Sequence, residues 1–156
     1  MNCPMCTRWE EDADLHIAEM EHSFAILNRD QFFTGYTLLF TREHVTELFH
    51  LEPAIRQGLM DEVTTVAAAL DRVFRPAKMN YELLGNMVPH MHWHLVPRFR
   101  EDSLWPRPIW SEPHKEKFLE PEEYQDRIRK IRDALNTGLQ GRTASAQGAC
   151  HAPLHK

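Results

Sequence analysis

The stretch PHMHWHLVPRF, residues 89–99, places three histidines at every second position with apolar residues between them. Side chains alternate between the two faces of a β-strand. A strand here puts His90, His92 and His94 on one face, and Met91 and Trp93 on the other. We expect the apolar face to join the core and the histidine face to carry chemistry.

The segments upstream of this stretch predict more strands and a long helix. SFAILNRD (23–30), TGYTLLFT (34–41) and KMNYELLG (78–85) have the apolar, β-branched and aromatic content of strands. HLEPAIRQGLMDEVTTVAAALDRVF (50–74) repeats apolar residues at three- and four-residue steps, which is typical of an amphipathic helix. The acidic segment before them, residues 7–22, is expected to be a short helix or a loop.

The region after the histidines predicts an ordered loop, a second helix and a tail. SLWPRPIWSEP (103–113) holds two tryptophans, a large apolar content for a mobile segment, and these rings either cap a base by stacking or pack on the sheet. PEEYQDRIRKIRDALNTGL (121–139) predicts an amphipathic helix. We expect one domain over residues 1–137, and residues 138–156, small and polar, to be a disordered tail.

Composition excludes several classes of protein. A formal net charge of −5 argues against a protein that binds nucleic acid through phosphate neutralisation. No apolar run approaches the roughly 20 residues of a membrane span, and residues 1–16 lack a signal-peptide pattern, so we expect a cytoplasmic protein that does not bind membranes. In a reducing compartment, Cys3 and Cys6 are expected to be a metal half-site or a redox pair rather than a disulfide.

Three histidines on one strand face favour chemistry over packing, because each unsatisfied buried ring nitrogen costs roughly 1–3 kcal/mol. Two functional readings follow. Either the imidazoles are ligands of a metal such as zinc, or one of them attacks a phosphorus while its neighbours orient it and contact the phosphate. A solvated strand face is the alternative without function, and the spacing alone does not decide among them.

At this point the sequence resembles the histidine triad (HIT) family, whose pattern is His-φ-His-φ-His-φ-φ with an apolar residue at each φ. HMHWHLV (90–96) fits that pattern, and FAILNRDQFFTGYTLLFTREHVTELFHL (24–51) is similar to the region from the nucleotide-contacting strand onward. The likeness includes the fragile histidine triad branch of dinucleoside polyphosphate hydrolases. It implies an α+β, HIT-like fold with an antiparallel sheet of about five strands, a long helix and a C-terminal helix, assembled as a homodimer.

The resemblance also implies roles for individual residues. His92 matches the nucleophile that takes up the nucleotidyl group, His94 the partner that contacts the phosphate and handles protons, and His90 the residue that supports the site or binds metal. Asn28 falls where the family contacts the ribose, and Asn86 where many members carry a glutamine near the phosphates.

The sequence departs from the family at two positions. Met87 stands where members often carry a serine or threonine near the scissile bond, and Tyr36 replaces a histidine of the fragile histidine triad branch. A hydrogen bond from residue 87 to the leaving group is therefore missing, whereas the Tyr36 hydroxyl can join the same network.

Zinc-bearing members combine a Cys-x-x-Cys pair with a histidine before the long helix and with the first histidine of the triad. The matching positions here are Cys3, Cys6, His44 and His90, which predicts a structural zinc site beside the triad. Arg98, at the end of the histidine strand, is expected to be a solvated strand end.

The resemblance thus implies a nucleotide hydrolase or nucleotidyltransferase. It attacks the α-phosphate of a dinucleoside polyphosphate or adenylylated small molecule through a covalent nucleotidyl-histidine, with adenine nucleotides favoured. Two alternatives remain. One is a zinc hydrolase that uses the triad as metal ligands, and the other is a non-catalytic module that binds nucleotides or is stabilised by zinc.

Overall fold

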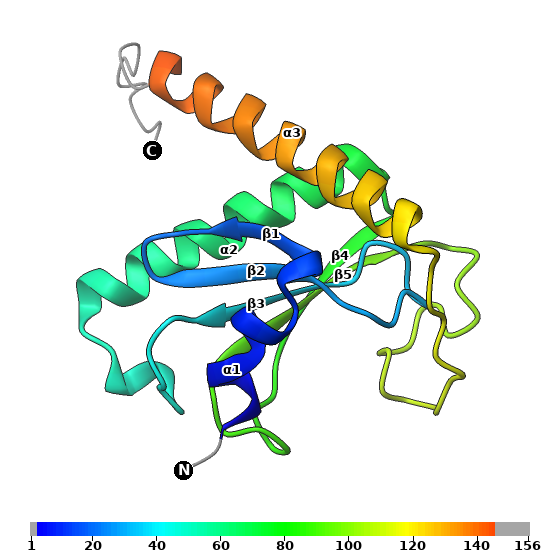
Figure 1. Cartoon of the computed structure of the whole chain (residues 1–156), viewed down its shortest axis with the longest axis horizontal. Coiled ribbons are helices and arrows are strands. Elements are labelled where there is room, and N and C mark those ends of the chain that lie inside the picture. Colours follow the sequence, from blue (N-terminus) through cyan, green and yellow to red (C-terminus); the bar gives the residue numbers. More distant parts are fainter. Residues whose placement is uncertain (1–2, 146–156) are drawn as a thin grey trace, which may run out of the picture.

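Five antiparallel strands form one sheet at the centre of the computed structural model, which describes residues 3–145 and the side chains through residue 138 (Figure 1). The order across the sheet is β1-β2-β3-β5-β4, so β1 and β4 are its edges. The strands are β1 (His16–Glu19), β2 (Ser23–Leu27), β3 (Thr37–Thr41), β4 (Lys78–Leu83) and β5 (His92–Arg98). The expected α+β fold with five antiparallel strands is thus confirmed.

Pairing register assigns side chains to the two faces of the sheet. Phe24 lies opposite Phe40, and Phe40 lies opposite His92. His94 lies between Leu38 on β3 and Glu82 on β4. Because paired residues point to the same side, His92 and His94 share one face, and Trp93 points to the other, where it is buried as predicted.

Helices occupy both sides of the sheet. The predicted long helix is α2 (Pro53–Phe74), which crosses behind the strands in Figure 1 and packs on β2 and β5. Its buried stripe is Leu59, Val63, Val66 and Leu70, each contributing about 1.5–3 kcal/mol by burial. The second helix, α3 (Pro121–Ser145), lies along α2 and β1. A short helix, α1 (Pro4–Glu11), packs on the histidine face, and two 3₁₀ turns are η1 (Ala13–Leu15) and η2 (Leu48–His50).

Gly35 determines how β3 enters the sheet beside the histidines. Its φ is +82°, and a Cβ atom there would lie 2.7 Å from Cε2 of Phe74 at the end of α2. A side chain would therefore meet both backbone strain and a ring that is packed in place. Tyr36, the next residue, then lies where its hydroxyl contacts His94 on the histidine face.

The structure differs from the sequence-based expectations at three places. His16–Glu19 forms an edge strand where a helix or loop was predicted. The prediction was wrong because the segment is short and carries a helix-favouring alanine and glutamate. Helix α3 continues to Ser145, beyond the predicted start of the tail at residue 138, and residues 146–156 lie outside the described residues. His90 precedes β5, so the three histidines do not lie on one continuous strand.

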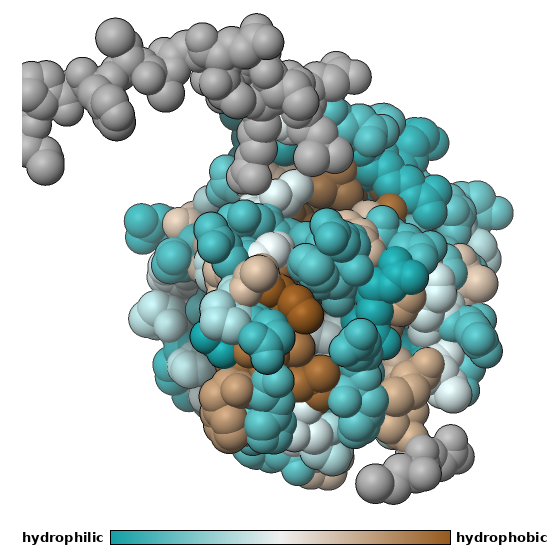
Figure 2. All heavy atoms as spheres, turned by 90° about the vertical axis from the view of Figure 1, so that its left-hand side faces the viewer, coloured by the Kyte–Doolittle hydropathy of each residue, from teal (hydrophilic) through white to brown (hydrophobic). Residues whose placement is uncertain are grey.

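Figure 2 shows the end of the molecule that lies to the left in Figure 1. Hydrophobic side chains gather there in a hollow that is surrounded by hydrophilic ones. In the described residues, a pocket of about 140 Å³ between the segment after β3 and the start of α2 is lined in part by Val45, Leu51 and Ile55. None of the helices within residues 3–145 has the length and apolar character needed to cross a membrane.

Candidate active site and metal centre

His92 is held in one tautomer by the backbone. Its Nδ1 lies 2.6 Å from the carbonyl oxygen of His90, and a carbonyl only accepts hydrogen bonds. Nδ1 must therefore carry the proton and donate it. The lone pair of Nε2 is then available, which is the state that a nucleophile requires. The side chain is 7% exposed.

His94 is the second histidine of the pair, and Tyr36 fixes its orientation. The Tyr36 hydroxyl lies 2.5 Å from Nδ1 of His94. Burial and the positive charge that His92 can take up lower the pKa of His94 to about 4, so its ring is neutral at pH 7. Burial, then the charge of Glu82, raises the pKa of Tyr36, which keeps the phenol protonated. Tyr36 therefore donates its hydroxyl proton to Nδ1 of His94. The single N–H proton of the His94 ring then lies on Nε2.

The two rings lie next to each other on the histidine face. Their centroids are 4.8 Å apart with an interplanar angle of 70°. One ring can thus offer a lone pair while its neighbour offers an N–H, which is a suitable arrangement for binding and attacking a phosphoryl group.

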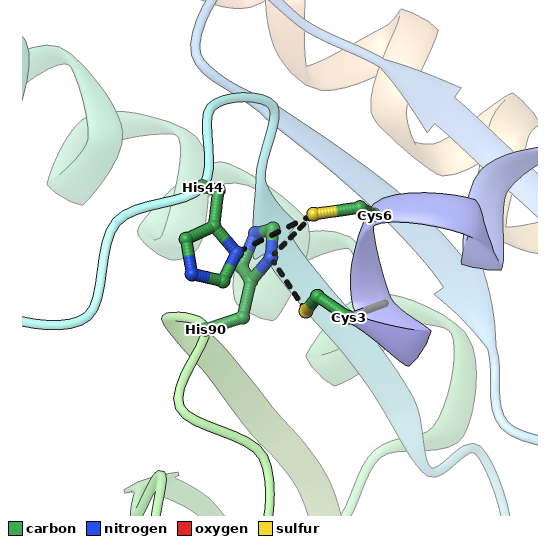
Figure 3. Close-up of side chains that lie close together, drawn as sticks. All are labelled: Cys3, Cys6, His44 and His90. Carbon is green, nitrogen blue, oxygen red and sulfur yellow. Dashed lines mark hydrogen bonds between the residues drawn. The ribbon is translucent and has the colours of Figure 1, made fainter. Parts of the chain in front are cut away.

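Cys3, Cys6, His44 and His90 converge on one another, as Figure 3 shows, and His90 lies two residues before His92. The cysteines belong to the start of α1, His44 to the segment after β3, and His90 to the segment before β5. Their potential ligand atoms all lie within 4.8 Å of one another. The structure therefore brings the predicted ligand residues together, although they come from three distant parts of the sequence.

The donor set fits a tetrahedral zinc ion. Sγ of Cys6 is 3.4 Å from Nδ1 of His44 and 3.6 Å from Nδ1 of His90, and Sγ of Cys3 is also 3.6 Å from the latter atom. Ideal zinc–sulfur and zinc–nitrogen bonds at tetrahedral angles separate sulfur from nitrogen by roughly 3.6 Å. Desolvation and the neighbouring Cys3 raise the pKa of the Cys6 thiol, so two thiolates here require a cation.

His90 contacts both sites. Its Nε2 lies 2.8 Å from the carbonyl oxygen of Thr41, to which it donates, and this leaves Nδ1 as the atom that faces the cysteines. Hydrogen bonding of the distal nitrogen to a carbonyl is the usual support of a metal-binding histidine. Its own carbonyl accepts the His92 proton, so His90 contacts His92 through its backbone and the two cysteines through its ring.

Helix α1 is also fastened by an aromatic stack. The Trp9 ring lies between His16, at 3.3 Å and 2°, and Phe24, at 4.4 Å and 17°. Trp9 and His16 were not singled out from the sequence, because a stack between a helix and an edge strand leaves no periodic signal. It holds the helix that carries both cysteines against the histidine face.

The two predicted substrate-binding asparagines lie in different pockets. Asn28, after β2, lines an open pocket of about 770 Å³ together with Tyr36 and Trp110. Asn86, in the turn before β5, is exposed and lines a pocket of about 400 Å³ with His90. Met87 is 94% exposed, so its side chain extends into solvent rather than toward the histidines.

The loop after β5 reaches back to His94. The Trp110 ring meets that of His94 at a centroid distance of 5.1 Å and an angle of 78°, and its indole N–H donates to Glu82. Arg98 is 1% exposed, which overturns the expectation of a solvated strand end. It is buried because its guanidinium bonds Asp102 and the Arg107 carbonyl and thereby anchors this loop.

The chain is similar to known proteins in sequence and in fold. Residues 10–101 match the HIT domain. The chain is 27% identical over 104 residues to Protein hit of Bacillus subtilis, covering 63% of this chain and 72% of that protein. It is 28% identical over 98 residues to the asymmetrical bis(5′-nucleosyl)-tetraphosphatase of Schizosaccharomyces pombe, covering 60% of this chain and 54% of that protein.

Solved structures show the same fold. A histidine triad protein from Bradyrhizobium japonicum has a TM-score of 0.73 at 27% identity, over 81% of this chain and 94% of that one. A zinc-bound histidine triad family protein from Mycobacterium smegmatis has a TM-score of 0.66 at 24% identity, over 90% and 98% of the two chains. Since the matched residues 10–101 include the whole sheet and all three histidines of the motif, the chain belongs to the HIT family.

Proposed function

We propose that this chain is a nucleotide hydrolase or nucleotidyltransferase whose nucleophile is Nε2 of His92. The observation that carries the proposal is the 2.6 Å contact between His92 Nδ1 and the His90 carbonyl, which leaves Nε2 unprotonated and aimed away from the backbone. Membership in a family of nucleotide hydrolases and transferases supports it. So does the likeness to a bis(5′-nucleosyl)-tetraphosphatase.

The reaction proceeds in two displacements. Nε2 of His92 attacks the α-phosphorus of the substrate, a nitrogen–phosphorus bond forms, and the bond from phosphorus to the leaving oxygen or nitrogen breaks with its electron pair on the leaving group. Water then attacks the same phosphorus, its proton passes to solvent, and the electron pair of the breaking bond returns to Nε2. Nucleoside monophosphate is the product.

His94 and Tyr36 stabilise charge in both displacements. His94 Nε2–H lies beside the attacking ring and donates to a phosphoryl oxygen, whose negative charge grows as the bond forms. Tyr36 prevents the opposite tautomer by occupying Nδ1 as a donor. The roles of His90 are to hold the His92 proton and to bind metal.

A zinc ion at Cys3, Cys6, His44 and His90 is proposed as a structural cofactor. These four residues would hold the ion without an open position for a substrate or water, and the ion would tie α1 to the segment that supports His92. Among the described residues, this is the cluster with metal-ligand geometry, and it contains His90 but neither His92 nor His94. The alternative of a zinc hydrolase with the triad as its ligands therefore has less support.

Substrate contacts by Asn28 and Asn86, the preference for an adenine nucleotide and assembly as a homodimer remain proposals. The pocket of Asn86 includes His90, and the pocket of Asn28 includes Tyr36 and Trp110, which both contact His94, so the two pockets suit a substrate that extends past His92. Strand β4 is a sheet edge with an unpaired side in the described chain, and a second copy could pair there. Light scattering coupled to size-exclusion chromatography tests the dimer.

Turnover of a substrate panel tests the function. The panel holds diadenosine tri- and tetraphosphate, an adenosine phosphoramidate and a sugar nucleotide, and the wild type is run beside His92→Asn and beside His50→Asn, a control at an exposed histidine. We expect nucleoside monophosphate from the wild type and the control alone, and a nucleotidyl adduct on the quenched wild type by intact-protein mass spectrometry. Equal turnover by His92→Asn would mean another nucleophile. Nucleotide binding without turnover would identify a binding module, and loss of turnover on chelation with no adduct at any time would favour the zinc hydrolase.

A further inference from the structure

Trp110 is exposed, yet its ring is held in a defined orientation. The residue is 50% exposed, and its indole N–H donates to the carboxylate of Glu82 on the neighbouring strand. On its other side the ring meets His94 at 78°, so the contact leaves much of its area uncovered. An uncovered aromatic ring whose N–H is already bonded has little conformational freedom left to lose on binding. Such a ring is suited to stack on another planar group.

The loop that carries Trp110 is fastened to the sheet at both ends. Near its start, Arg98 Nε is 2.9 Å from Asp102 Oδ2, and Arg98 Nη1 is 2.9 Å from the Arg107 carbonyl. Near its end, His114 Nε2 is 2.7 Å from Asp30 Oδ2 in the segment after β2. These contacts place the loop on the lining of the pocket of about 770 Å³, which Asn28 and Tyr36 also line.

The residues on the lining of this pocket differ in chemistry. The loop side offers the apolar surfaces of Ile109, Trp110 and Phe118. From the segment after β2, the Asn28 amide donates to the carbonyl of Asp30 at 3.2 Å, which leaves its Oδ1 as an acceptor for a ligand hydroxyl. An aromatic ring and a hydroxyl acceptor on the lining of one pocket match a nucleoside, with the base on the ring and the sugar on the amide.

The cations of this pocket do not favour a phosphate chain. Arg29 lies 2.8 Å from both Asp12 and Asp14, and Arg8 forms an ion pair with Asp12. Their charges are therefore largely balanced within the protein. Glu112, which pairs with Arg107, and Glu116 lie on the same lining and add no positive charge for a polyphosphate, so the pocket is better matched to the uncharged end of a nucleotide.

We propose that Trp110 is a specificity-determining residue that stacks on the nucleobase of the nucleotide whose phosphorus His92 attacks. The family's ribose contact falls at Asn28, and this chain adds an aromatic ring to the same pocket, on which purines bind better than pyrimidines because they cover more of the ring. The inference rests on the proposed function. The path from His92 to Trp110 runs through His94, at ring separations of 4.8 and 5.1 Å, so base and phosphorus of one nucleotide can occupy both ends.

Calorimetric binding of AMP and ribose 5-phosphate tests the subsite, since these two ligands differ only in the base. The proteins are the wild type, Trp110→Ala, Trp110→Phe and Trp105→Ala, the last being the same substitution at the other tryptophan of this loop. We expect Trp110→Ala to weaken AMP binding on the order of tenfold and to leave ribose 5-phosphate binding unchanged. Trp110→Phe should restore most of the AMP affinity, and Trp105→Ala should retain it.

Several results would overturn the inference. These are no binding of AMP by the wild type, unchanged AMP affinity in Trp110→Ala, or equal weakening of both ligands, which would mean that the residue only holds the loop. A change in the oligomeric state of ligand-free Trp110→Ala would assign the ring to an interface between copies instead. Because binding needs no turnover, the two proposals can fail separately. A wild type that binds AMP through Trp110 without hydrolysing the panel would refute the hydrolase and support the subsite. An active enzyme whose AMP binding does not depend on Trp110 would refute the subsite and support the hydrolase.

Discussion

Acidification should unfold this protein partly through His94. Its pKa falls from 6.5 to about 4 on folding, because burial and His92 disfavour the charged ring. Between these two pH values the unfolded chain binds a proton at His94 that the folded chain does not bind. The contribution of His94 to the free energy of unfolding is therefore fully present above the unfolded pKa and is lost as the pH falls. A difference of this size corresponds to about 3 kcal/mol in all, of which about 2 kcal/mol is lost by roughly pH 5.

Urea denaturation near pH 7.5 and near pH 5 measures this contribution when the wild type is compared with His94→Gln, which does not titrate. We expect the wild-type midpoint to fall by roughly 1 M more than that of the variant over this range. His90, whose pKa is also lowered by burial, affects both proteins alike and cancels in the difference. His50→Gln, at an exposed position, should keep the wild-type slope. Equal pH dependence in the wild type and His94→Gln would refute the assignment of a buried, neutral His94.

Three further predictions concern the residues around the histidine face. Tyr36→Phe leaves a buried ring nitrogen without its donor, so we expect about 1–3 kcal/mol lower stability by denaturant titration and a lower kcat with little change in KM. Gly35→Ala combines a positive φ with an overlap with the Phe74 ring and should cost about 2–4 kcal/mol, measured in the same way; a neutral result would mean that α2 can move away. Metal chelation, or Cys6→Ser, should lower Tm and change the fluorescence of Trp9 as α1 loosens, and added zinc should reverse only the effect of chelation.

The sequence predicted the parts of the fold that repeat with a fixed period. The helix around Leu59 and Val63 and the strand around Trp93 follow periods of 3.6 and 2, and both were placed correctly. Strand β1 was missed because an edge strand of four residues is stabilised by its pairing with β2 rather than by its own composition. The continuation of α3 to Ser145 was missed for a similar reason, since its last residues are small and polar.

At the site, residue types were predictable but their contacts were not. The alternation of His92 and His94 could be read from the sequence. The bonds of His92 to the His90 carbonyl and of His94 to the Tyr36 hydroxyl could not, because they depend on how the chain folds around the strand. No sequence pattern pointed to Glu82, because it belongs to the site only through its position opposite His94 in the strand register. The burial of Arg98 likewise depends on a loop that folds back over the strand end.

The single residue His90 connects the cluster that could hold a metal with the proposed nucleophile. Its ring belongs to the four-ligand cluster, and its carbonyl sets the proton position on the neighbouring imidazole. Whatever free energy a metal contributes to nucleotide binding through this residue, bound nucleotide must contribute equally to the retention of the metal, because linkage between two sites is reciprocal. A protein loaded with nucleotide should therefore release its metal to a competing chelator at a higher chelator concentration than the free protein, and the size of that shift reports how strongly one backbone carbonyl connects the two centres.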